Sequence, residues 1–245
     1  QRNLLQIELE RFTENAEKVG RVAMCGRIRQ ARNLWDYLEA LRWSGGIDLG
    51  EDTWPSVNVP PGTRPLTLHR LGDGSEQIDL VYWGYQPPKA PRLYLNARLD
   101  KIIANSGFWK RQFEHGRVII PADGWYEWTG EKPNKQPWFI SPKDGAPILM
   151  ATISAWRPGD EHNKEHGMAI VTDDSAGGMV DIHDRRPITL APNDALEWID
   201  PATTNDQAKE ILATARSESA FQWWQVTKAM GNSKYQLADA SDPLG

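Results

Sequence analysis

Short hydrophobic runs bounded by turn residues recur along the chain and predict β-strands. Two of these runs, 66–70 and 77–83, are separated by Gly72-Asp73-Gly74, which predicts a β-hairpin. The remaining runs of this kind predict strands at 118–120, 125–129, 148–156, 168–172 and 223–227. The segment 54–65 is rich in proline and glycine and is predicted to be a loop.

Hydrophobic residues at helical spacing predict a helix from about residue 31 to 43, with Asn33 as a possible N-cap. Further helices are predicted at 105–114, 193–199 and 205–216, the last two with an asparagine at the start. Because strands and helices do not alternate regularly, we expect an α+β fold. A mainly antiparallel, barrel-like sheet flanked by helices is the architecture that this order of elements favours.

The 245 residues suit one domain, with a distinct segment at the N-terminal end. Residues 1–24 show an amphipathic helical pattern among Glu, Arg and Lys, and this pattern breaks at Gly20. We therefore divide the chain into an N-terminal appendage (1–24), one domain (25–232) and a C-terminal tail (233–245) that we expect to be frayed.

Composition narrows the class of protein only moderately. The net charge of −5 argues against nucleic-acid binding through bulk charge, although a local basic groove is compatible with it. The single cysteine excludes an internal disulfide, and no apolar run approaches the length of a membrane span. The first residues also lack the layout of a signal peptide. A soluble cytoplasmic protein is the expectation, with most of the twelve Trp in the core.

Four segments concentrate reactive side chains: Met24–Arg27, Asn96–Arg98, Pro121–Trp128 and Ile182–Pro187. Each has an ordinary structural interpretation. A lone cysteine is most often a small buried hydrophobic residue, and a glutamate between aromatic residues is often the outward residue of a strand. The histidine could be structural, the asparagine could end a turn, and the arginines could be solvated. Together, Cys25, Glu127, His183 and Asn96 form a set suited to covalent catalysis with acid–base support. No metal-ligand spacing or phosphate-binding glycine loop is present, so no metal or other cofactor is expected.

The four segments, taken in order, resemble the motifs of the SOS response-associated peptidase (SRAP) family. They are Met-Cys-Gly-Arg, Asn-Ala-Arg, Pro-Ala-Asp-Gly-Trp-Tyr-Glu-Trp and Ile-His-Asp-Arg-Arg-Pro. The similarity runs from Met24 to about Lys228, and four ordered motifs at domain-scale spacing are far more specific than any one of them.

The resemblance implies that Cys25 becomes the N-terminal residue and captures abasic sites in single-stranded DNA. Its α-amine and thiol would attack the ring-opened aldehyde, giving an imine and then a thiazolidine. An α-amine titrates near 8 and a lysine near 10.4, so roughly 200 to 300 times more of the α-amine is neutral at pH 7. The adjacent thiol would then trap a reversible imine.

The resemblance also implies roles for the other residues. Glu127 would transfer protons during ring opening and imine formation, His183 would assist, and Asn96 would orient the sugar or the Cys25 backbone. Three arginines would hold phosphates beside the lesion, and Trp83 would stack on a neighbouring base. These three are Arg27, Arg98 and Arg185.

The chain departs from the family pattern at three places. Asp100 stands where the family usually has Glu, Arg186 replaces a Met, and the usual C-terminal motif is blurred into Gln225–Lys228. We expect altered DNA contacts from these changes and an unchanged reaction.

Residues 1–24 bear directly on the chemistry, because a cysteine that follows other residues has no free α-amine. Three explanations remain open: the start at Gln1 lies upstream of a true start at Met24, the segment is a propeptide removed by cleavage after Met24, or it stays attached and the thiol acts alone.

Three functions remain open as well. The first is covalent capture of abasic sites during the DNA-damage or SOS response. The second is a Cys-dependent peptidase or hydrolase with Cys25 as nucleophile and His183 or Glu127 as base. The third is a non-catalytic module that binds single-stranded DNA.

The expected partner is single-stranded DNA with abasic sites. We expect the protein to be a monomer that is cytoplasmic, nucleoid-associated when bound to DNA, and without membrane involvement.

Overall fold

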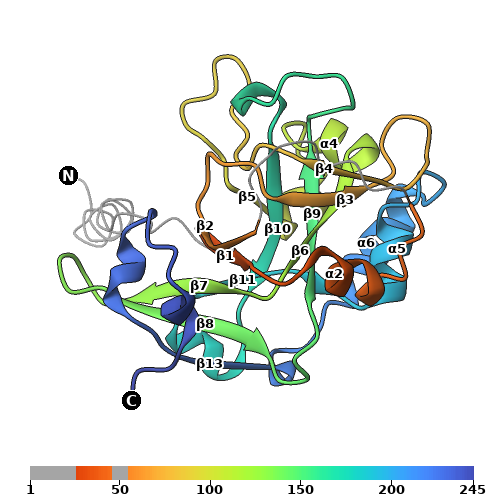
Figure 1. Ribbon diagram of the computed structural model, residues 1–245. Helices are drawn as coiled ribbons and strands as arrows, with labels where there is room; N and C mark the ends of the chain where they lie inside the picture. The colour runs from red at the N-terminus through yellow and green to blue at the C-terminus, as the bar shows by residue number, and fades with distance from the viewer. Residues whose placement is uncertain (1–25, 46–54) are drawn as a thin grey trace, which may run out of the picture.

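The computed structural model describes residues 26–45 and 55–245, which form two sheets with short helices around them (Figure 1). One sheet has the strand order β13-β8-β7-β1-β2, and the other has the order β11-β10-β9-β6-β3-β4, with β12 on β9 and β5 on β10. The strands are β1 (Arg27–Gln30), β2 (Ser56–Val59), β3 (Leu66–His69), β4 (Gln77–Leu80), β5 (Asn96–Arg98), β6 (Arg117–Ala122), β7 (Gly124–Thr129), β8 (Gln136–Pro142), β9 (Ile148–Ser154), β10 (Met168–Asp174), β11 (Arg185–Pro187), β12 (Thr189–Leu190) and β13 (Phe221–Gln225).

The helices are short and lie mostly beside the larger sheet. The α-helices are α2 (Leu34–Ala40), α3 (Leu99–Ile103), α4 (Lys110–His115), α5 (Pro192–Trp198) and α6 (Asn205–Ala213). The 3-10 helices are η1 (Lys164–His166), η2 (Gly177–Asp181), η3 (Glu218–Ala220), η4 (Lys228–Gly231) and η5 (Ala238–Ser241). Within the described ranges, no helix is both long and apolar enough to span a membrane.

The strand pairing confirms the α+β class and the mainly antiparallel sheet. The pairing of β5 with β10 is parallel, whereas the other named strand pairs are antiparallel. In the described part of the chain the smaller sheet ends at β13 and β2 and does not close on itself. The arrangement is therefore barrel-like only loosely.

Strands β7 and β8 are buried on both faces over most of their length. Trp125 and Ile140 face the core between the sheets, and both are fully buried. Tyr126 and Phe139 face the opposite way, into a smaller cluster with Val226, Met230 and Ala240. Because side chains alternate along a strand, Glu127 lies on the same face as Trp125.

The predicted helix at 31–43 is confirmed as α2. The Asn33 side chain accepts a hydrogen bond from the backbone N–H of Asp36 at 3.1 Å, which satisfies one of the free donors at the helix start. The prediction of a cap at Asn33 is therefore confirmed.

Two sequence expectations about elements were wrong. The predicted loop 54–65 contains β2, which pairs with β1 and has Asn58 fully buried. The predicted helix 105–114 begins only at Lys110, because Asn105 adopts a left-handed φ of 53° that ends the preceding turn. Helix α5 begins at Pro192, one residue before the predicted Asn193, whereas α6 begins at Asn205 as predicted, with Thr204 as its N-cap.

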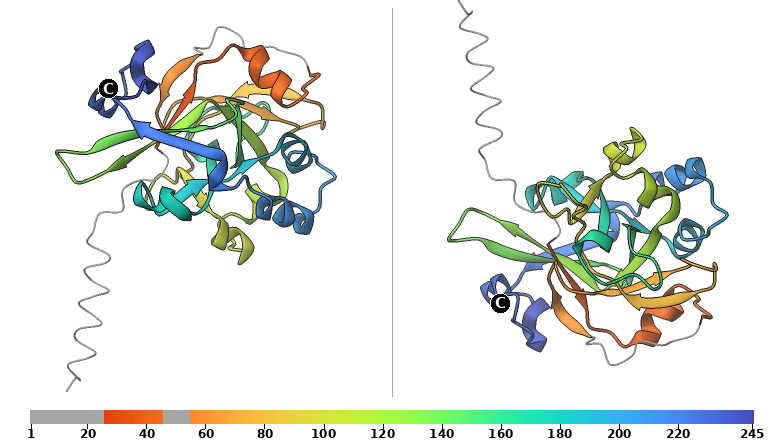
Figure 2. Two further views of the ribbon diagram at one scale, coloured as in Figure 1. Left: turned by 90° about the horizontal axis from the view of Figure 1, so that it is seen from below. Right: turned by 90° about the horizontal axis from the view of Figure 1, so that it is seen from above.

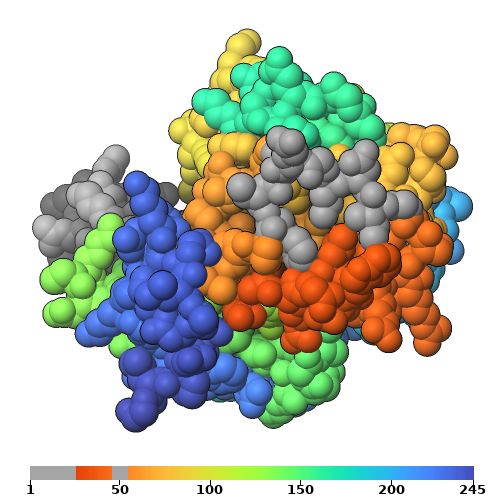
Figure 3. All heavy atoms as spheres, viewed as in Figure 1, coloured from red at the N-terminus to blue at the C-terminus, as the bar shows by residue number. Residues whose placement is uncertain are grey.

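The expectation of a frayed C-terminal tail was also wrong. Ala240 is fully buried, and Ser241 accepts a hydrogen bond from the Trp224 indole N–H at 2.8 Å. Two further hydrogen bonds join β2 to this segment: the Asn58 side-chain amide donates to the Tyr235 carbonyl at 3.1 Å, and the Gln236 side-chain amide donates to the Asn58 carbonyl at 3.0 Å. In the space-filling view, the segment lies against the smaller sheet as part of the molecular surface (Figure 3). Residues 233–245 therefore pack as part of the domain.

Candidate functional site

The site is built around Glu127, which lies on β7 and is only 3% exposed. Strand β7 is central in its sheet, with β1 on one side and β8 on the other. Arg27 on β1 pairs with Tyr126 on β7 in antiparallel register. The residue before Arg27, where the described chain begins, therefore lies beside Glu127. The pairing brings the chain directly after Cys25 next to the strand that carries Glu127.

Asp123, which begins the turn before β7, fixes β1 in this position. Its carboxylate accepts a hydrogen bond from the Tyr37 hydroxyl at 2.5 Å and another from the Arg32 guanidinium at 3.1 Å. Arg29 on β1 donates to the same carboxylate. Burial and the Asp123 carboxylate raise the pKa of Tyr37, so its hydroxyl remains a donor. The aspartate of the Pro-Ala-Asp-Gly motif thus ties together β1, α2 and β7.

The glycine after it is required by close packing. A Cβ at Gly124 would lie 2.2 Å from the Ile140 carbonyl oxygen and 2.6 Å from the Phe139 ring. Only glycine lets β7 approach β8 this closely at the point where the strand begins.

The arginines at the ends of β5 and β11 meet at one carboxylate. Arg98 binds Asp100 through two hydrogen bonds of 2.8 and 3.0 Å, and Arg185 lies 3.8 Å from the same carboxylate. Arg185 also contacts Asp174 at 3.3 Å. Hydrogen bonding from Arg98 lowers the pKa of Asp100, so the carboxylate is charged at neutral pH. The structure therefore brings these two arginines together, with Asp100 between them.

His183 lies two residues before Arg185, and its side chain is 12% exposed. The backbone N–H of Arg185 donates to its Nδ1 at 3.1 Å, and an Asp184 oxygen lies 2.8 Å from the same nitrogen. Burial lowers the pKa of His183 from its ordinary 6.5, and Asp184 partly opposes this effect. The imidazole is therefore mainly neutral at pH 7, which suits a group that accepts a proton.

Lys135, at the turn end of the β7–β8 hairpin, adds a small electrostatic effect at His183. Its charge is near enough to His183 to contribute to the lowered pKa of that imidazole. Lys135 directly precedes Gln136, which pairs with Thr129, two residues beyond Glu127. The loop that carries His183 therefore lies within electrostatic range of the turn end of the hairpin that carries Glu127. Nothing in the Pro-Asn-Lys-Gln surroundings of Lys135 indicates from the sequence which element this side chain would approach.

Asn96 and Arg98 share one face of β5, which lies beside β10. Arg27, by contrast, pairs with Tyr126 and so lies on the face of the smaller sheet opposite Glu127. Its guanidinium donates to Asn58 at 3.0 Å and to the Met230 carbonyl at 3.3 Å, above the Trp128 ring. Arg27 is thus not grouped with Arg98 and Arg185. Cys25 lies outside the described residues.

The expectation for Trp83 was wrong. Trp83 is fully buried in the core between the sheets, and its indole N–H donates to the Leu95 carbonyl at 3.1 Å. A base needs an accessible ring face to stack on, and this ring has none. Tryptophan serves cores and recognition surfaces equally well, so residue type alone could not separate the two roles.

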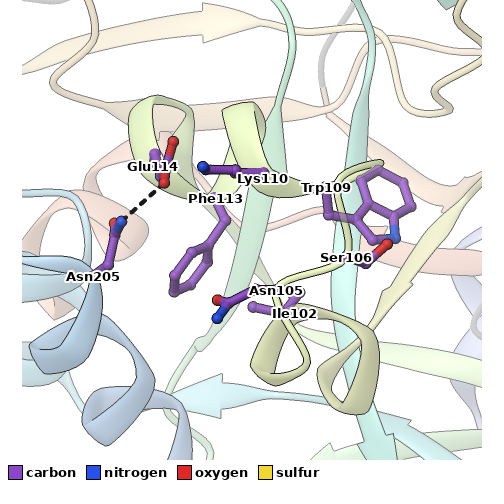
Figure 4. A pocket seen from close by; sticks show the side chains of 8 residues that line it. All are labelled: Ile102, Asn105, Ser106, Trp109, Lys110, Phe113, Glu114 and Asn205. Carbon is purple, nitrogen blue, oxygen red and sulfur yellow. Dashed lines mark hydrogen bonds between the residues drawn. The ribbon is translucent and has the colours of Figure 1, made fainter.

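A small cavity of about 20 Å³ lies among α3, α4 and α6, where Asn205 donates to Glu114 at 3.2 Å (Figure 4). None of the candidate site residues lines it. A volume of this size holds about one water molecule, so the cavity is too small for a substrate. In the described residues, no group of three or more His, Cys, Asp and Glu side chains is placed to hold a metal ion.

Comparisons with known proteins agree on one family. The model of the SOS response associated peptidase (SRAP) family matches residues 24–233. The abasic site processing protein YedK of Escherichia coli is 40% identical over 227 residues, covering 90% of this chain and all of that protein. HMCES of Xenopus tropicalis, also named an abasic site processing protein, is 27% identical over 77% of this chain and 70% of its own length.

A solved structure extends the similarity to the fold. A phage-related protein of Bordetella bronchiseptica superposes with a TM-score of 0.77 at 47% identity, covering 87% of this chain and 99% of that one. The family model, the sequence similarity and the shared fold all cover most of the chain. The protein therefore belongs to the SOS response-associated peptidase family.

Proposed function

We propose that this protein captures abasic sites in single-stranded DNA by forming a covalent crosslink through Cys25. The observation that carries the proposal is the pairing of β1 with β7, which brings the chain following Cys25 beside the buried Glu127. The names of the relatives support the substrate class, since YedK and HMCES are both abasic site processing proteins.

The proposed chemistry needs a nucleophile and a proton relay. The Cys25 α-amine adds to the C1′ aldehyde of the opened deoxyribose, and loss of water gives an imine. The thiol then adds to the imine carbon, closing a thiazolidine, and its proton goes to the nitrogen. Glu127 exchanges protons with the ring oxygen and the departing water, with neutral His183 as its partner. Asn96 orients the sugar, and Arg98 and Arg185 hold the flanking phosphates.

The family name also indicates a second reaction, the cleavage of a peptide bond. A peptidase activity would use the Cys25 thiol as nucleophile and His183 as base, with cleavage after Met24 as its first product. The same cleavage would free the α-amine for capture, so the two reactions can follow one another in a single chain.

The test of the proposed function is intact-mass spectrometry after mixing the protein with single-stranded DNA that carries one abasic site. We expect a mass equal to the chain from Cys25 plus the DNA, less one water. DNA with an intact base at that position is the control and should give no adduct. An unmodified protein mass with a chain known to begin at Cys25 would contradict the proposal.

The pH dependence should report on His183. Asp184 raises the pKa of His183, so Asp184→Asn should lower it further and keep the imidazole neutral to lower pH. The capture rate of this variant, divided by that of the unmodified chain, should be near one at neutral pH and rise as the pH falls below 6.5. The ratio cancels the titration of the amine and thiol, which both chains share. Adding His183→Gln to both chains should flatten the ratio, and a flat ratio without that change would remove His183 from the proton transfer.

A further inference from the structure

We propose that Trp138 is the aromatic platform on which a nucleobase next to the abasic nucleotide stacks. The inference rests on the proposed function and adds to it a residue that contacts the DNA. It replaces the role that the sequence suggested for Trp83, which is buried.

The register of the β7–β8 hairpin places Trp138 directly across from Glu127. Residues that face each other across antiparallel strands share one face, with Cβ atoms about 4.5–5.5 Å apart. Trp138 thus lies on the same face of the sheet as Glu127 and immediately beside it. A base stacked on its ring would lie within one nucleotide of the sugar that Glu127 serves.

Along this face of the hairpin, burial of the side chains decreases at the Glu127–Trp138 pair. The preceding pair, Trp125 and Ile140, is fully buried, and Glu127 is 3% exposed. Trp138 is partly exposed, as is the following pair, Thr129 and Gln136. The hairpin projects from the body of the molecule, as two further views show (Figure 2). Trp138 therefore sits at the margin between core and solvent, where a ligand can reach it.

A hydrogen bond at the edge of the Trp138 indole fixes the orientation of the ring. Its N–H donates to the Thr129 hydroxyl at 2.8 Å across the hairpin. Because this hydrogen bond satisfies the polar edge, the accessible part of the ring offers an apolar face, which is what a base stacks on.

The other tryptophans of this sheet are less suited to the role. Trp128 lies on the opposite face, beneath the Arg27 guanidinium. Trp224 also faces away from Glu127, toward Phe139 and the C-terminal segment. Trp223 shares the face of Glu127, but it packs on the core, and a Cβ at Gly178 would lie 3.3 Å from its ring. Trp138 is the one placed both beside the glutamate and at the edge of the core.

The chemistry of the substrate favours such a platform. An abasic nucleotide has no base, so the base beside it loses a stacking partner on the side of the lesion. An indole at that position would replace the missing base and hold the strand in register with Glu127. Lys135, near His183, adds a positive charge on the same hairpin for the accompanying phosphates.

The test is a double-mutant cycle between the protein and the DNA. The probe is single-stranded DNA with a tetrahydrofuran at the lesion, which cannot open to an aldehyde and so reports binding alone. We expect Trp138→Leu to weaken binding about 5- to 100-fold, the usual scale for losing one base–aromatic stack. When the base on one side of the lesion is also replaced by a tetrahydrofuran, the same substitution should change the affinity by less than about twofold.

Two control variants test whether a loss of DNA affinity comes from the Trp138 ring itself. Trp138→Phe preserves a smaller ring and should retain part of the affinity, while Trp35→Leu removes a tryptophan that is 68% exposed on α2 and should change nothing. An equal loss with and without each neighbouring base would overturn the inference, because Trp138 would then support the hairpin instead of the DNA. Unchanged binding by both Trp138 variants would overturn it as well. Failure of the unmodified chain to crosslink a true abasic site would instead overturn the proposed function.

Discussion

A chain that begins at Cys25 is expected to crosslink to abasic single-stranded DNA, and the Cys25→Ser variant of that chain is expected to form no thiazolidine. The thiazolidine needs both the α-amine and the thiol on one residue, and serine provides an oxygen that does not trap the imine as a stable product. An imine alone is reversible. The chain with Cys25 should give a heat-stable crosslinked band on a denaturing gel, and the Cys25→Ser chain should give none. The mass of the adduct would confirm the crosslink.

The α-amine can be tested separately from the thiol. A chain that retains Met24 keeps the Cys25 thiol but turns its amine into an amide, which is not nucleophilic. Capture by this chain should fall at least about 100-fold. Its α-amine belongs to the new first residue and cannot close a thiazolidine with the Cys25 thiol, and the neutral fraction of lysine amines at pH 7 is roughly 200 to 300 times smaller. Binding to tetrahydrofuran-containing DNA is the control and should be retained by the Cys25→Ser chain. Equally fast capture with residues 1–24 verified as still attached would show that the thiol acts without the amine.

The sequence predicted the family and the strands of the site better than it predicted side-chain environments. The Pro-Ala-Asp-Gly-Trp-Tyr-Glu-Trp motif indicated a strand, and β7 lies there. Its alternation could not show that both faces are covered, because the covering residues come from β13 and the C-terminal segment, about 100 positions later in the chain. Glu127 is therefore a buried carboxyl, where an outward position was the ordinary expectation.

Pairing between distant segments explains the other differences. Strand β8 was not predicted, because Pro137 and Pro142 weaken the strand pattern, yet β7 and β13 pair with it on both sides. Asp100 was noted only as a departure from the family pattern. In the structure it is the shared partner of Arg98 and Arg185, which a linear spacing of 87 residues between those arginines cannot reveal.

The position of Asp100 changes what is expected of those arginines. Both guanidinium groups already have a carboxylate partner, so a phosphate held there as proposed would have to compete with Asp100 or be shared with it. Aspartate is one methylene shorter than the usual glutamate, and here it reaches Arg98 only two positions away. The replacement of the usual glutamate by Asp100 thus affects the contact that would change DNA affinity. Asp100 lies at a distance from Glu127 along the chain.

Among the residues proposed to transfer protons, Glu127 should have the largest effect on the capture rate. Glutamine has nearly the same shape as glutamate and can occupy the same place on β7, but it cannot transfer a proton at neutral pH. Glu127→Gln should therefore slow capture about ten- to a thousandfold, in the range of losses seen when a general acid–base is removed. Single-turnover rates with saturating protein and abasic DNA would measure the effect.

Binding and stability separate this role from a structural one. Glu127→Gln should leave the affinity for tetrahydrofuran-containing DNA and the melting temperature close to those of the unmodified chain. Glu131→Gln, an exposed carboxylate in the turn of the same hairpin, is the matched control and should leave all three quantities unchanged. A fall in affinity or melting temperature that accounts for the slower capture would mean that Glu127 holds β7 against its neighbours. Since Glu127 is buried beside a partly exposed tryptophan at the point where its strand leaves the core, a loss confined to the rate is the outcome that its position favours.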